Sequence, residues 1–500
     1  MNRAESIARL ADKSEEWDIL IVGGGATGLG IAVDAASRGY RTALLEKADF
    51  AESTSSKSTK LIHGGVRYLR GGEVGLVRES LRERGRLLRN APALVKPLSF
   101  VVPAYRWYEQ FFYGSGLTLY DLLAGDLGIG STGHLSDLET IGKVQNLRGK
   151  GLYGSTFYWD GQFDDARLAI AMARTAYEHG AAVVNHMGVE RLLKEKGRVV
   201  GVAAKNQVGE DEFEIRAKVV INATGVFSDS IRKMDDPEAE ERIAPSQGIH
   251  IVLDQSFLGG ETAVMIPSTD DGRVLFAIPW KGRVLLGTTD TGPVPVELHP
   301  KPESEEVAYL LEHAGRYFEK APGVGDIKAV FAGLRPLVKP ASVAGGDTAS
   351  ISRSHSLTVG ESNLVTIAGG KWTTYREMAE DTVTLAERVG DFESRACITA
   401  DLPLLCEEPS EAKAETISPS LPYRWDDIDR AVEQEMAQTL DDVLSRRTRC
   451  TFLETKESKE IAPEVARRMA GLLGKSDEWV SEELTRFSEL RSLETPYIPE

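Results

Sequence analysis

One glycine-rich stretch near the start of the chain constrains the fold more than any other feature. The apolar run at 19–22 leads into G-G-G-A-T-G at 23–28, and the pattern predicts a helix over 29–37. A strand that opens into G-x-G-x-x-G and then a helix is typical of a dinucleotide-binding βαβ unit. In such a turn Gly23 allows the tight bend, Gly25 admits the pyrophosphate and Gly28 lets the helix pack on the strand. The helix N-terminus favours phosphate groups.

An acidic residue follows at the spacing that this unit requires. Glu46 comes directly after the apolar residues 43–45, about twenty residues beyond the glycine turn. At the end of a second strand, a carboxylate can accept hydrogen bonds from a ribose. The sequence therefore predicts a dinucleotide site, but the motif alone does not separate FAD from NAD.

Composition limits the remaining options. A chain of 500 residues is too long for one simple core, so two or three domains are expected. Its 59 basic and 76 acidic residues give a net charge of −17, which argues against nucleic acid as a partner. Three cysteines without a C-x-x-C pair argue against a disulfide framework, a metal site or an iron–sulfur cluster, and favour a reducing cytosol. No run of about 18 apolar residues is present, so membrane attachment is expected to be peripheral.

The rest of the chain divides into recognisable segments. Periodicity predicts helices over 73–90, 164–179 and 305–317, and strands at 182–184, 198–202, 213–217 and 219–225. Short strands between 249 and 290 predict an antiparallel sheet in a second domain. A strand at 364–368 leads through Gly369-Gly370-Lys371 into a helix that returns the chain to the first domain. After a linker at 407–421, apolar residues at helical spacing (428, 432, 436, 440 and 443, then 465, 469, 472 and 473) predict a small helical domain.

An aromatic segment at 105–123 has two interpretations. Trp107, Phe111 and Phe112 stand among several tyrosines and leucines after a proline-interrupted stretch. The segment either caps the nucleotide domain or forms a membrane-facing apolar patch.

Several blocks, taken together and in order, resemble one family. They are S-S-K-S-T-K-L-I-H-G-G-V-R-Y-L at 55–69, D-D-A-R-L at 164–168, N-A-T-G at 222–225, F-A-I-P-W at 276–280, G-T-T-D at 287–290, G-L-R-P-L at 333–337 and G-G-K-W-T-T-Y-R at 369–376. With the glycine turn, they closely resemble FAD-dependent glycerol-3-phosphate dehydrogenases from residue 17 to about 390, and weakly in the tail. The first and last of these blocks are the most specific.

The resemblance implies an α/β fold of the glutathione-reductase type, with an FAD-binding Rossmann domain, an antiparallel-sheet substrate domain and a small helical C-terminal domain. The expected boundaries are 17–95, 155–240 and 326–395 for the FAD-binding domain, 96–154 and 241–325 for the substrate domain, and 396–500 for the helical domain.

The same resemblance implies oxidation of sn-glycerol 3-phosphate to dihydroxyacetone phosphate by a non-covalently bound FAD, with membrane quinone as the electron acceptor. An oxidase branch that uses oxygen carries a long insertion before its G-G-K block, whereas only seventeen residues separate Arg353 from Lys371 here. A multi-subunit relative has a cysteine-rich tail that this chain lacks, which favours one chain type, with a homodimer as one option. The expected location is the cytoplasm, with peripheral attachment to the inner face of the cell membrane.

The resemblance also assigns site residues. The substrate positions combine cations, a hydroxyl donor and a histidine, and are Arg67, Tyr68, His250, Arg335, Ser352, Arg353 and Lys371. The cofactor positions are Gly23, Gly25, Ala26, Thr27, Gly28, Glu46, Ser55, Ser56, Lys60, Leu61, Ile62, His63, Val189, Ala223, Gly225, Gly370, Lys371, Trp372 and Thr373.

His250 is the expected general base, because a neutral imidazole accepts protons near pH 7. Arg335 is its rival for the proton, or an electrostatic stabiliser of the forming alkoxide. The alternatives are surface ion pairs for the arginines and a carbonyl-bonded core histidine. At the level of the whole protein, the alternatives are a D-amino-acid or glycine oxidase, which would need a carboxylate and amine pocket, and a non-catalytic flavoprotein, which would lack the arginines.

Overall fold

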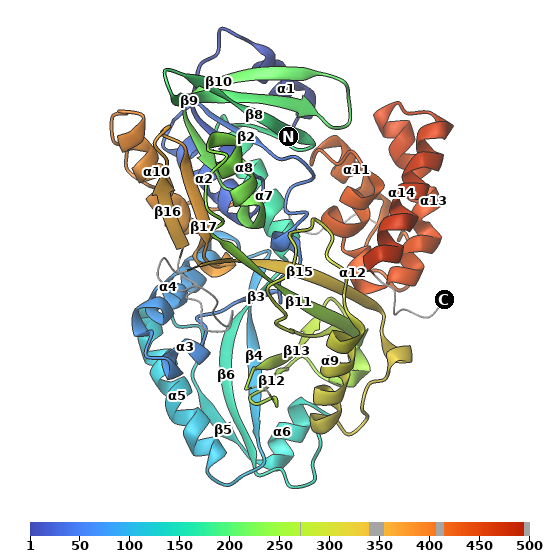
Figure 1. The fold of residues 1–500 in the computed structure, drawn as a ribbon. Helices are drawn as coiled ribbons and strands as arrows, with labels where there is room; N and C mark the ends of the chain where they lie inside the picture. The colour runs from blue at the N-terminus through green and yellow to red at the C-terminus, as the bar shows by residue number, and fades with distance from the viewer. Residues whose placement is uncertain (271, 340–354, 407–414, 495–500) are drawn as a thin grey trace.

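The apolar run before the glycine turn forms the central strand of the first sheet. β1 (Trp17–Val22) pairs in parallel with β2 (Thr42–Leu45) on one side and with β10 (Glu212–Asn222) on the other. β1 and β2 are almost wholly buried, because helices cover one face of the sheet and the segment 187–204 packs against the other. The computed structural model describes residues 1–270, 272–339, 355–406 and 415–494 (Figure 1).

The first sheet has the strand order β16-β17-β10-β1-β2-β7. Its outer strands are β7 (Ala182–Val184), β17 (Val365–Gly369) and the antiparallel edge strand β16 (His355–Val359). Three helices that contact one another pack on this sheet, namely α2 (Ala26–Ser37), α7 (Asp165–Glu178) and α10 (Tyr375–Val389). The expected helix over 164–179 and the return strand at 364–368 are confirmed.

β10 is longer than the sequence pattern indicated. The expected strands at 213–217 and 219–225 are one continuous strand, whose first half pairs with the antiparallel strand β9 (Arg198–Asn206). β9 pairs in turn with β8 (Met187–Glu195). The second half of β10 pairs with β1. A single strand therefore joins the inserted antiparallel sheet to the parallel one.

The second sheet has the order β15-β11-β14-β13-β12-β4-β6-β3, with β5 beside β6. Its strands are β3 (Leu61–Ile62), β4 (Val95–Ala104), β5 (Gly133–Leu135), β6 (Gly154–Phe163), β11 (Ile243–Asp254), β12 (Ala263–Ile266), β13 (Leu275–Trp280), β14 (Arg283–Gly287) and β15 (Ala329–Val338). All pairs are antiparallel except β12 with β4. Two of the expected domain boundaries are wrong here: β6 and β15 were placed in the FAD-binding domain, but their hydrogen bonds to β4 and β11 put them in this sheet.

Other helices cover the two sheets. They are α1 (Arg3–Ala11), α3 (Arg67–Arg70), α4 (Val74–Asn90), α5 (Glu109–Ala124), α6 (Asp137–Lys143), α8 (Ser228–Asp235) and α9 (Ser304–Tyr317). Helix α4 confirms the expected helix over 73–90, and α9 that over 305–317. Helix α1 lies in a polar, charged segment and was not predicted.

The last part of the chain is helical, as expected, and lies to the right in Figure 1. It contains α11 (Trp425–Glu433), a single π-helical turn η8 (Asp442–Arg447), α12 (Cys450–Leu453), α13 (Thr455–Leu473) and α14 (Asp477–Glu494). The apolar positions 428–443 do not form one helix: α11 ends at Glu433, and Met436 has a φ of 58°. Four of the five positions share the core of the helical domain, whereas Met436 packs into the core of the first domain.

The aromatic segment forms helix α5, which packs on the second sheet and not on the nucleotide domain as the first interpretation expected. Leu117 and Tyr120 are buried against the second sheet. Trp107, Phe111 and Phe112, by contrast, are 77, 77 and 62% exposed. Within the described residues, no helix is both long and apolar enough to cross a bilayer.

Candidate active site

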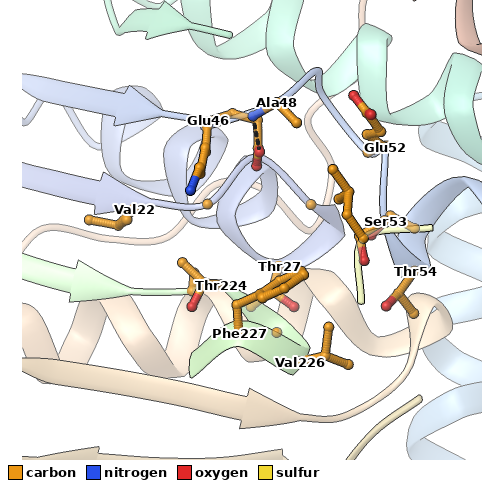
Figure 2. A pocket seen from close by; sticks show the side chains of 18 of the residues that line it. Val22, Thr27, Glu46, Ala48, Glu52, Ser53, Thr54, Thr224, Val226 and Phe227 are labelled. Carbon is orange, nitrogen blue, oxygen red and sulfur yellow. Dashed lines mark hydrogen bonds between the residues drawn. The ribbon is translucent and has the colours of Figure 1, made fainter. Parts of the chain in front are cut away.

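A cleft of about 830 Å³ opens at the carboxyl ends of β1 and β2. It is lined by the glycine turn, Glu46, Val189 and Gly225, together with Ser55 from the block at 55–69. Figure 2 shows Thr27, at the start of α2, beside Thr224 and Phe227, with Glu46 and Ala48 on the other side of the turn. Open α/β sheets bind ligands at this edge.

The glycines make this cleft fit a dinucleotide. A Cβ on Gly28 would lie 1.9 Å from the carbonyl oxygen of Gly23, so only glycine lets α2 approach the turn. Gly23 has a φ of +110°, and a Cβ there would lie 2.7 Å from the carbonyl oxygen of Ala223. The N-cap of α2 is Gly25, which has no side chain to occupy the phosphate position.

Glu46 lies at the end of β2, where an acid is needed to bind a ribose. Its carboxylate accepts hydrogen bonds from the backbone N–H groups of Gly24, at 2.6 Å, and Ala48, at 2.8 Å. Burial raises the pKa of Glu46, and these two bonds oppose the shift. The bonds orient the carboxylate at the rim of the cleft (Figure 2).

A smaller cavity of about 210 Å³ adjoins this cleft. Tyr68, His250, Arg335 and Lys371 line it, and these are four of the predicted substrate residues. Both cavities share Thr54, Pro336 and the segment 369–372, so the two spaces meet at the G-G-K-W block. A ring system at the junction would contact both a nucleotide-shaped cleft and a small cationic cavity.

Arg335 is fixed by the segment that follows β14. Its Nη2 donates to the carbonyl oxygen of Thr289 at 2.7 Å and to Thr288 Oγ1 at 3.2 Å. Its Nη1 lies 3.3 Å from Asp290 Oδ1. The register of β11 and β15 places Arg335 opposite Ser246, which brings the G-L-R-P-L block beside G-T-T-D.

His250 lies on β11 with its ring in the wall of the small cavity. The side chain is buried, stacks on Phe331 with 5.0 Å between ring centroids, and has Nε2 2.9 Å from Thr59 Oγ1. Burial, together with the positive charges of Lys60 and Arg335, lowers the pKa of His250 well below 6.5. The imidazole is therefore neutral at physiological pH, as a general base must be.

Lys371 and Tyr68 form the opposite wall. The Lys371 ammonium lies 4.1 Å from the centroid of the Tyr68 ring and 3.4 Å from Ser80 Oγ. A cation so placed is suited to an anionic group of a small ligand.

The side chain of Lys60 does not face either cavity. It is fully buried and donates to Asp165 Oδ2 at 2.6 Å and to the carbonyl oxygen of Ser56 at 2.7 Å. Burial lowers the pKa of Lys60 to about 7, although Asp165 opposes this shift. Lys60 therefore ties the 55–61 segment to α7, and only its backbone is left for the predicted contact with a cofactor.

The other predicted residues fall into three groups. The cleft or the small cavity is lined by Gly23, Gly25, Ala26, Thr27, Ser55, Leu61, His63, Val189, Ala223, Gly225, Gly370, Trp372 and Thr373. Gly28, Ser56 and Ile62 lie behind this lining and shape it. Ser352 and Arg353 lie outside the described residues, and the structure describes the backbone of Arg67, which begins α3, but not its side chain.

Some residues at the site were not predicted. Thr59 and Asp290 contact His250 and Arg335, and both stand in blocks that carried the resemblance, so their neighbours in sequence were the available signal. Residues of the helical domain also line the cleft, namely Thr439, Asp441, Arg486, Glu489 and Leu490. No motif marks these residues, because only the folded chain brings them to the cleft.

A buried charge cluster holds the helical domain against the first domain. Asp49 Oδ2 lies 2.6 Å from Arg446 Nε and 2.5 Å from Arg447 Nη1. His186 Nε2 lies 2.8 Å from Asp442 Oδ2 in the same cluster. Asp49, His186 and Asp442 have ligand-type atoms within 4.8 Å of one another, but the guanidinium groups already bind both carboxylates. The cluster is therefore suited to domain docking.

Comparison with known proteins agrees with this geometry. A family model described as FAD dependent oxidoreductase matches residues 18–376, and one described as the C-terminal domain of alpha-glycerophosphate oxidase matches residues 365–480. A probable mitochondrial glycerol-3-phosphate dehydrogenase of Caenorhabditis elegans is 39% identical over 518 aligned positions, which cover 92% of this chain and 71% of that protein. The mitochondrial glycerol-3-phosphate dehydrogenase of Homo sapiens is 38% identical, and the match covers 93% of this chain and 71% of that protein.

A solved structure extends the likeness to the whole chain. The glycerol-3-phosphate dehydrogenase from Bacillus halodurans, crystallised with FAD, has a TM-score of 0.78 at 27% sequence identity. The match covers 98% of this chain and 97% of that chain. The extent of these matches shows that this chain is an FAD-dependent oxidoreductase that belongs to the glycerol-3-phosphate dehydrogenase family.

Proposed function

We propose that the protein oxidises sn-glycerol 3-phosphate to dihydroxyacetone phosphate and passes the electrons to a membrane quinone. The observation that carries the proposal is the small cavity that adjoins the dinucleotide cleft at 369–372. Its volume suits a three-carbon ligand, and its lining includes three cationic residues, Lys57, Arg335 and Lys371, and a neutral imidazole. When bound, FAD would supply the hydride acceptor of the reaction.

Recognition of the phosphate is assigned to the cationic groups. Lys371 lies in the cavity wall with its ammonium over the Tyr68 ring. The family resemblance adds Arg67 and Arg353, whose guanidinium forks suit a dianion. An amino-acid substrate would instead place its ammonium group beside these cations, which disfavours the amine-oxidase alternative.

Proton removal from the C2 hydroxyl is assigned to His250. Its low pKa keeps the ring neutral, and the hydrogen bond between Nε2 and Thr59 holds the ring in the cavity wall. Arg335, fixed by the 288–290 segment, can stabilise the negative charge that develops on the oxygen as the proton leaves. In this assignment His250 accepts the proton and Arg335 stabilises the negative charge.

Delivery of electrons to a lipid-soluble quinone requires contact with a bilayer. The exposed side chains Trp107, Phe111, Phe112 and Leu122 gather on or beside α5 and suit the headgroup boundary. We therefore assign α5 to peripheral attachment on the cytoplasmic face of the cell membrane. The net charge of −17 opposes binding to anionic lipid, so the apolar side chains must supply the attraction.

The test is an anaerobic titration of purified, flavin-loaded protein. Glycerol 3-phosphate should bleach the visible flavin absorption, whereas glycine and D-alanine should leave it unchanged. Bleaching by the amino acids alone would overturn the substrate assignment. Re-oxidation of the bleached protein by a soluble quinone analogue should outpace re-oxidation by dissolved oxygen, and the reverse order would make the protein an oxidase.

A further inference from the structure

A buried tyrosine of α5 is bonded to the segment that carries the substrate residues. Tyr120 is fully buried, and its hydroxyl oxygen accepts a hydrogen bond from the backbone N–H of Gly64 at 2.6 Å. The same hydroxyl donates to Asp160 Oδ2 at 2.8 Å, and Asp160 is paired with Arg84 at 2.8 Å. The hydroxyl therefore has both a donor and an acceptor fixed by the core.

The turn that contains Gly64 has little freedom on either side. A Cβ on Gly64 would lie 2.7 Å from both the Leu81 side chain and the Tyr120 hydroxyl, so the turn packs directly against them. One residue earlier, the N–H of His63 donates to Thr373 Oγ1 at 3.2 Å. The turn is thus held by the G-G-K-W-T block at His63 and by α5 at Gly64.

The same turn also determines the position of Tyr68. The N–H of Tyr68 donates to the carbonyl oxygen of Gly65 at 2.9 Å, and a Cβ on Gly65 would lie 2.4 Å from the Tyr68 ring. The Tyr68 ring in turn lies 4.1 Å from the Lys371 ammonium. A shift of the Gly64 amide would therefore move Tyr68 relative to Lys371 within the wall that they form together.

We propose that Tyr120 is a positioning residue for the substrate cavity, because its hydroxyl fixes the Gly64 amide and, through the 63–65 turn, the placement of Tyr68 against Lys371. The assignment of this cavity to glycerol 3-phosphate rests on the proposed function. Tyr120 touches neither cavity itself, so its effect is on geometry and not on the chemical step.

The chain provides a matched control in Tyr158. This tyrosine is equally buried, and its ring contacts that of Tyr120 with 6.5 Å between centroids. Its hydroxyl, however, contacts Met265 Sδ at 3.6 Å and not the turn. Tyr120→Phe and Tyr158→Phe therefore each delete one buried hydroxyl from the same cluster, and only the first releases Gly64.

The experiment compares both variants as FAD-loaded proteins. For Tyr120→Phe, kcat/KM for glycerol 3-phosphate should fall about 10- to 100-fold, mainly through KM, because small misplacements of binding groups have effects of this size. Flavin content should stay at the wild-type level, and Tyr158→Phe should keep wild-type KM. Equal losses in the two variants, or an unchanged KM in Tyr120→Phe, would overturn the proposal.

A second measurement does not depend on the substrate. Hydrogen exchange of the Gly64 amide should accelerate at least tenfold in Tyr120→Phe and stay unchanged in Tyr158→Phe, since only the first loses its acceptor. Unchanged exchange would refute the positioning role even if the wild-type protein failed to oxidise glycerol 3-phosphate. The activity assay therefore tests the proposed function, and the exchange measurement tests this inference independently of it.

Discussion

The imidazole Nε2 of His250 and the hydroxyl oxygen of Thr59 lie 2.9 Å apart, and this bond joins the 55–69 block to β11 of the second sheet. The two residues are 191 positions apart in the sequence. β11 and the 55–61 segment meet here in the wall of the small cavity, which both residues line. The residues that would transfer a proton and those that would hold a cofactor therefore depend on the same contact.

Replacement of His250 by alanine should slow flavin reduction by glycerol 3-phosphate about 100- to 10,000-fold, the range for loss of a general base. Flavin content should stay near wild type, and rapid mixing under anaerobic conditions measures the rate. Because the pKa of His250 lies well below 6.5, the wild-type rate should stay constant as the pH falls to 6.5. It should decrease only at lower pH, where the ring binds a proton. A near-normal rate in the variant would assign the proton to Arg335 or to water.

Replacement of Lys371 by methionine should raise the KM for glycerol 3-phosphate, since loss of one partner of a charge-assisted contact costs about 2–5 kcal/mol. A suitable control is Lys143→Met. Lys143 also lies over an aromatic ring, 5.0 Å from the centroid of Phe157, but does not line the small cavity. Steady-state kinetics should separate the two variants, and equal KM values would exclude Lys371 from phosphate binding.

The close approach at the glycine turn predicts the outcome of adding a single methyl group. Gly28→Ala should yield protein without bound flavin, because the new Cβ would collide with the carbonyl oxygen of Gly23. Gly142→Ala, also in a helix but with no atom within 4 Å of its Cβ position, should bind flavin normally. The ratio of visible to ultraviolet absorbance measures occupancy. A yellow Gly28→Ala protein would show that the turn can move aside.

The exposed aromatic side chains of α5 can be tested with lipid vesicles. Vesicles should increase quinone reduction by the wild-type protein, and the double variant Phe111→Ser with Phe112→Ser should lose most of this increase while its flavin is still reduced normally. Leu472→Ser removes an exposed leucine from the helical domain and serves as the control. If the double variant still sediments with vesicles, the bilayer contact lies elsewhere on the protein.

The charge cluster between the domains should contribute strongly to stability. Asp49→Asn leaves buried guanidinium groups without full compensation and should lower the free energy of unfolding by about 3–5 kcal/mol. Asp429→Asn, at the exposed ion pair with Arg468, should cost about 0–1 kcal/mol. Chemical denaturation of each variant measures the difference. Similar values for the two would mean that the cluster contributes no more than a surface pair.

The contact between the helical domain and the first domain, which includes the ion pair of Glu435 with Arg167, should weaken in acid. Burial raises the pKa of Glu435, but Arg167 outweighs this and holds it at about 2, against 4.5 for an ordinary glutamate. The contribution of this pair is therefore fully present above about pH 4.5 and is lost as the pH falls towards 2.

The parts of the fold that local patterns determine were predictable. The strand, glycine turn and helix at 17–37 follow from hydrophobic run, turn chemistry and periodicity, all of which act over a few residues. The sheet to which β6 and β15 belong was not predictable, because pairing with β4 and β11 depends on contacts remote in sequence. For the same reason, the helical spacing over 428–443 did not show that Met436 leaves the core of the helical domain and packs into that of the first domain.

The candidate site shows a similar division. Tyr68, His250, Arg335 and Lys371 were singled out in the sequence, and the structure brings them to one cavity. Their supporting residues, Thr59 and Asp290, carry no recognisable pattern of their own. Lys60 was among the expected cofactor positions, and its pairing with Asp165 is visible only once α7 is in place.

The strand order of the first sheet has a consequence for synthesis on the ribosome. β1 emerges early, but its neighbour β10 follows about 200 residues later, which at about 5–20 residues per second is a delay of roughly 10–40 s. The segments around Glu489 and Leu490, which also line the cleft, are translated about 270 residues after β10. We expect flavin loading to follow translation of these segments. Nascent chains cut short before them should be colourless, and chains cut short before β10 should leave one side of β1 unpaired and open to chaperones.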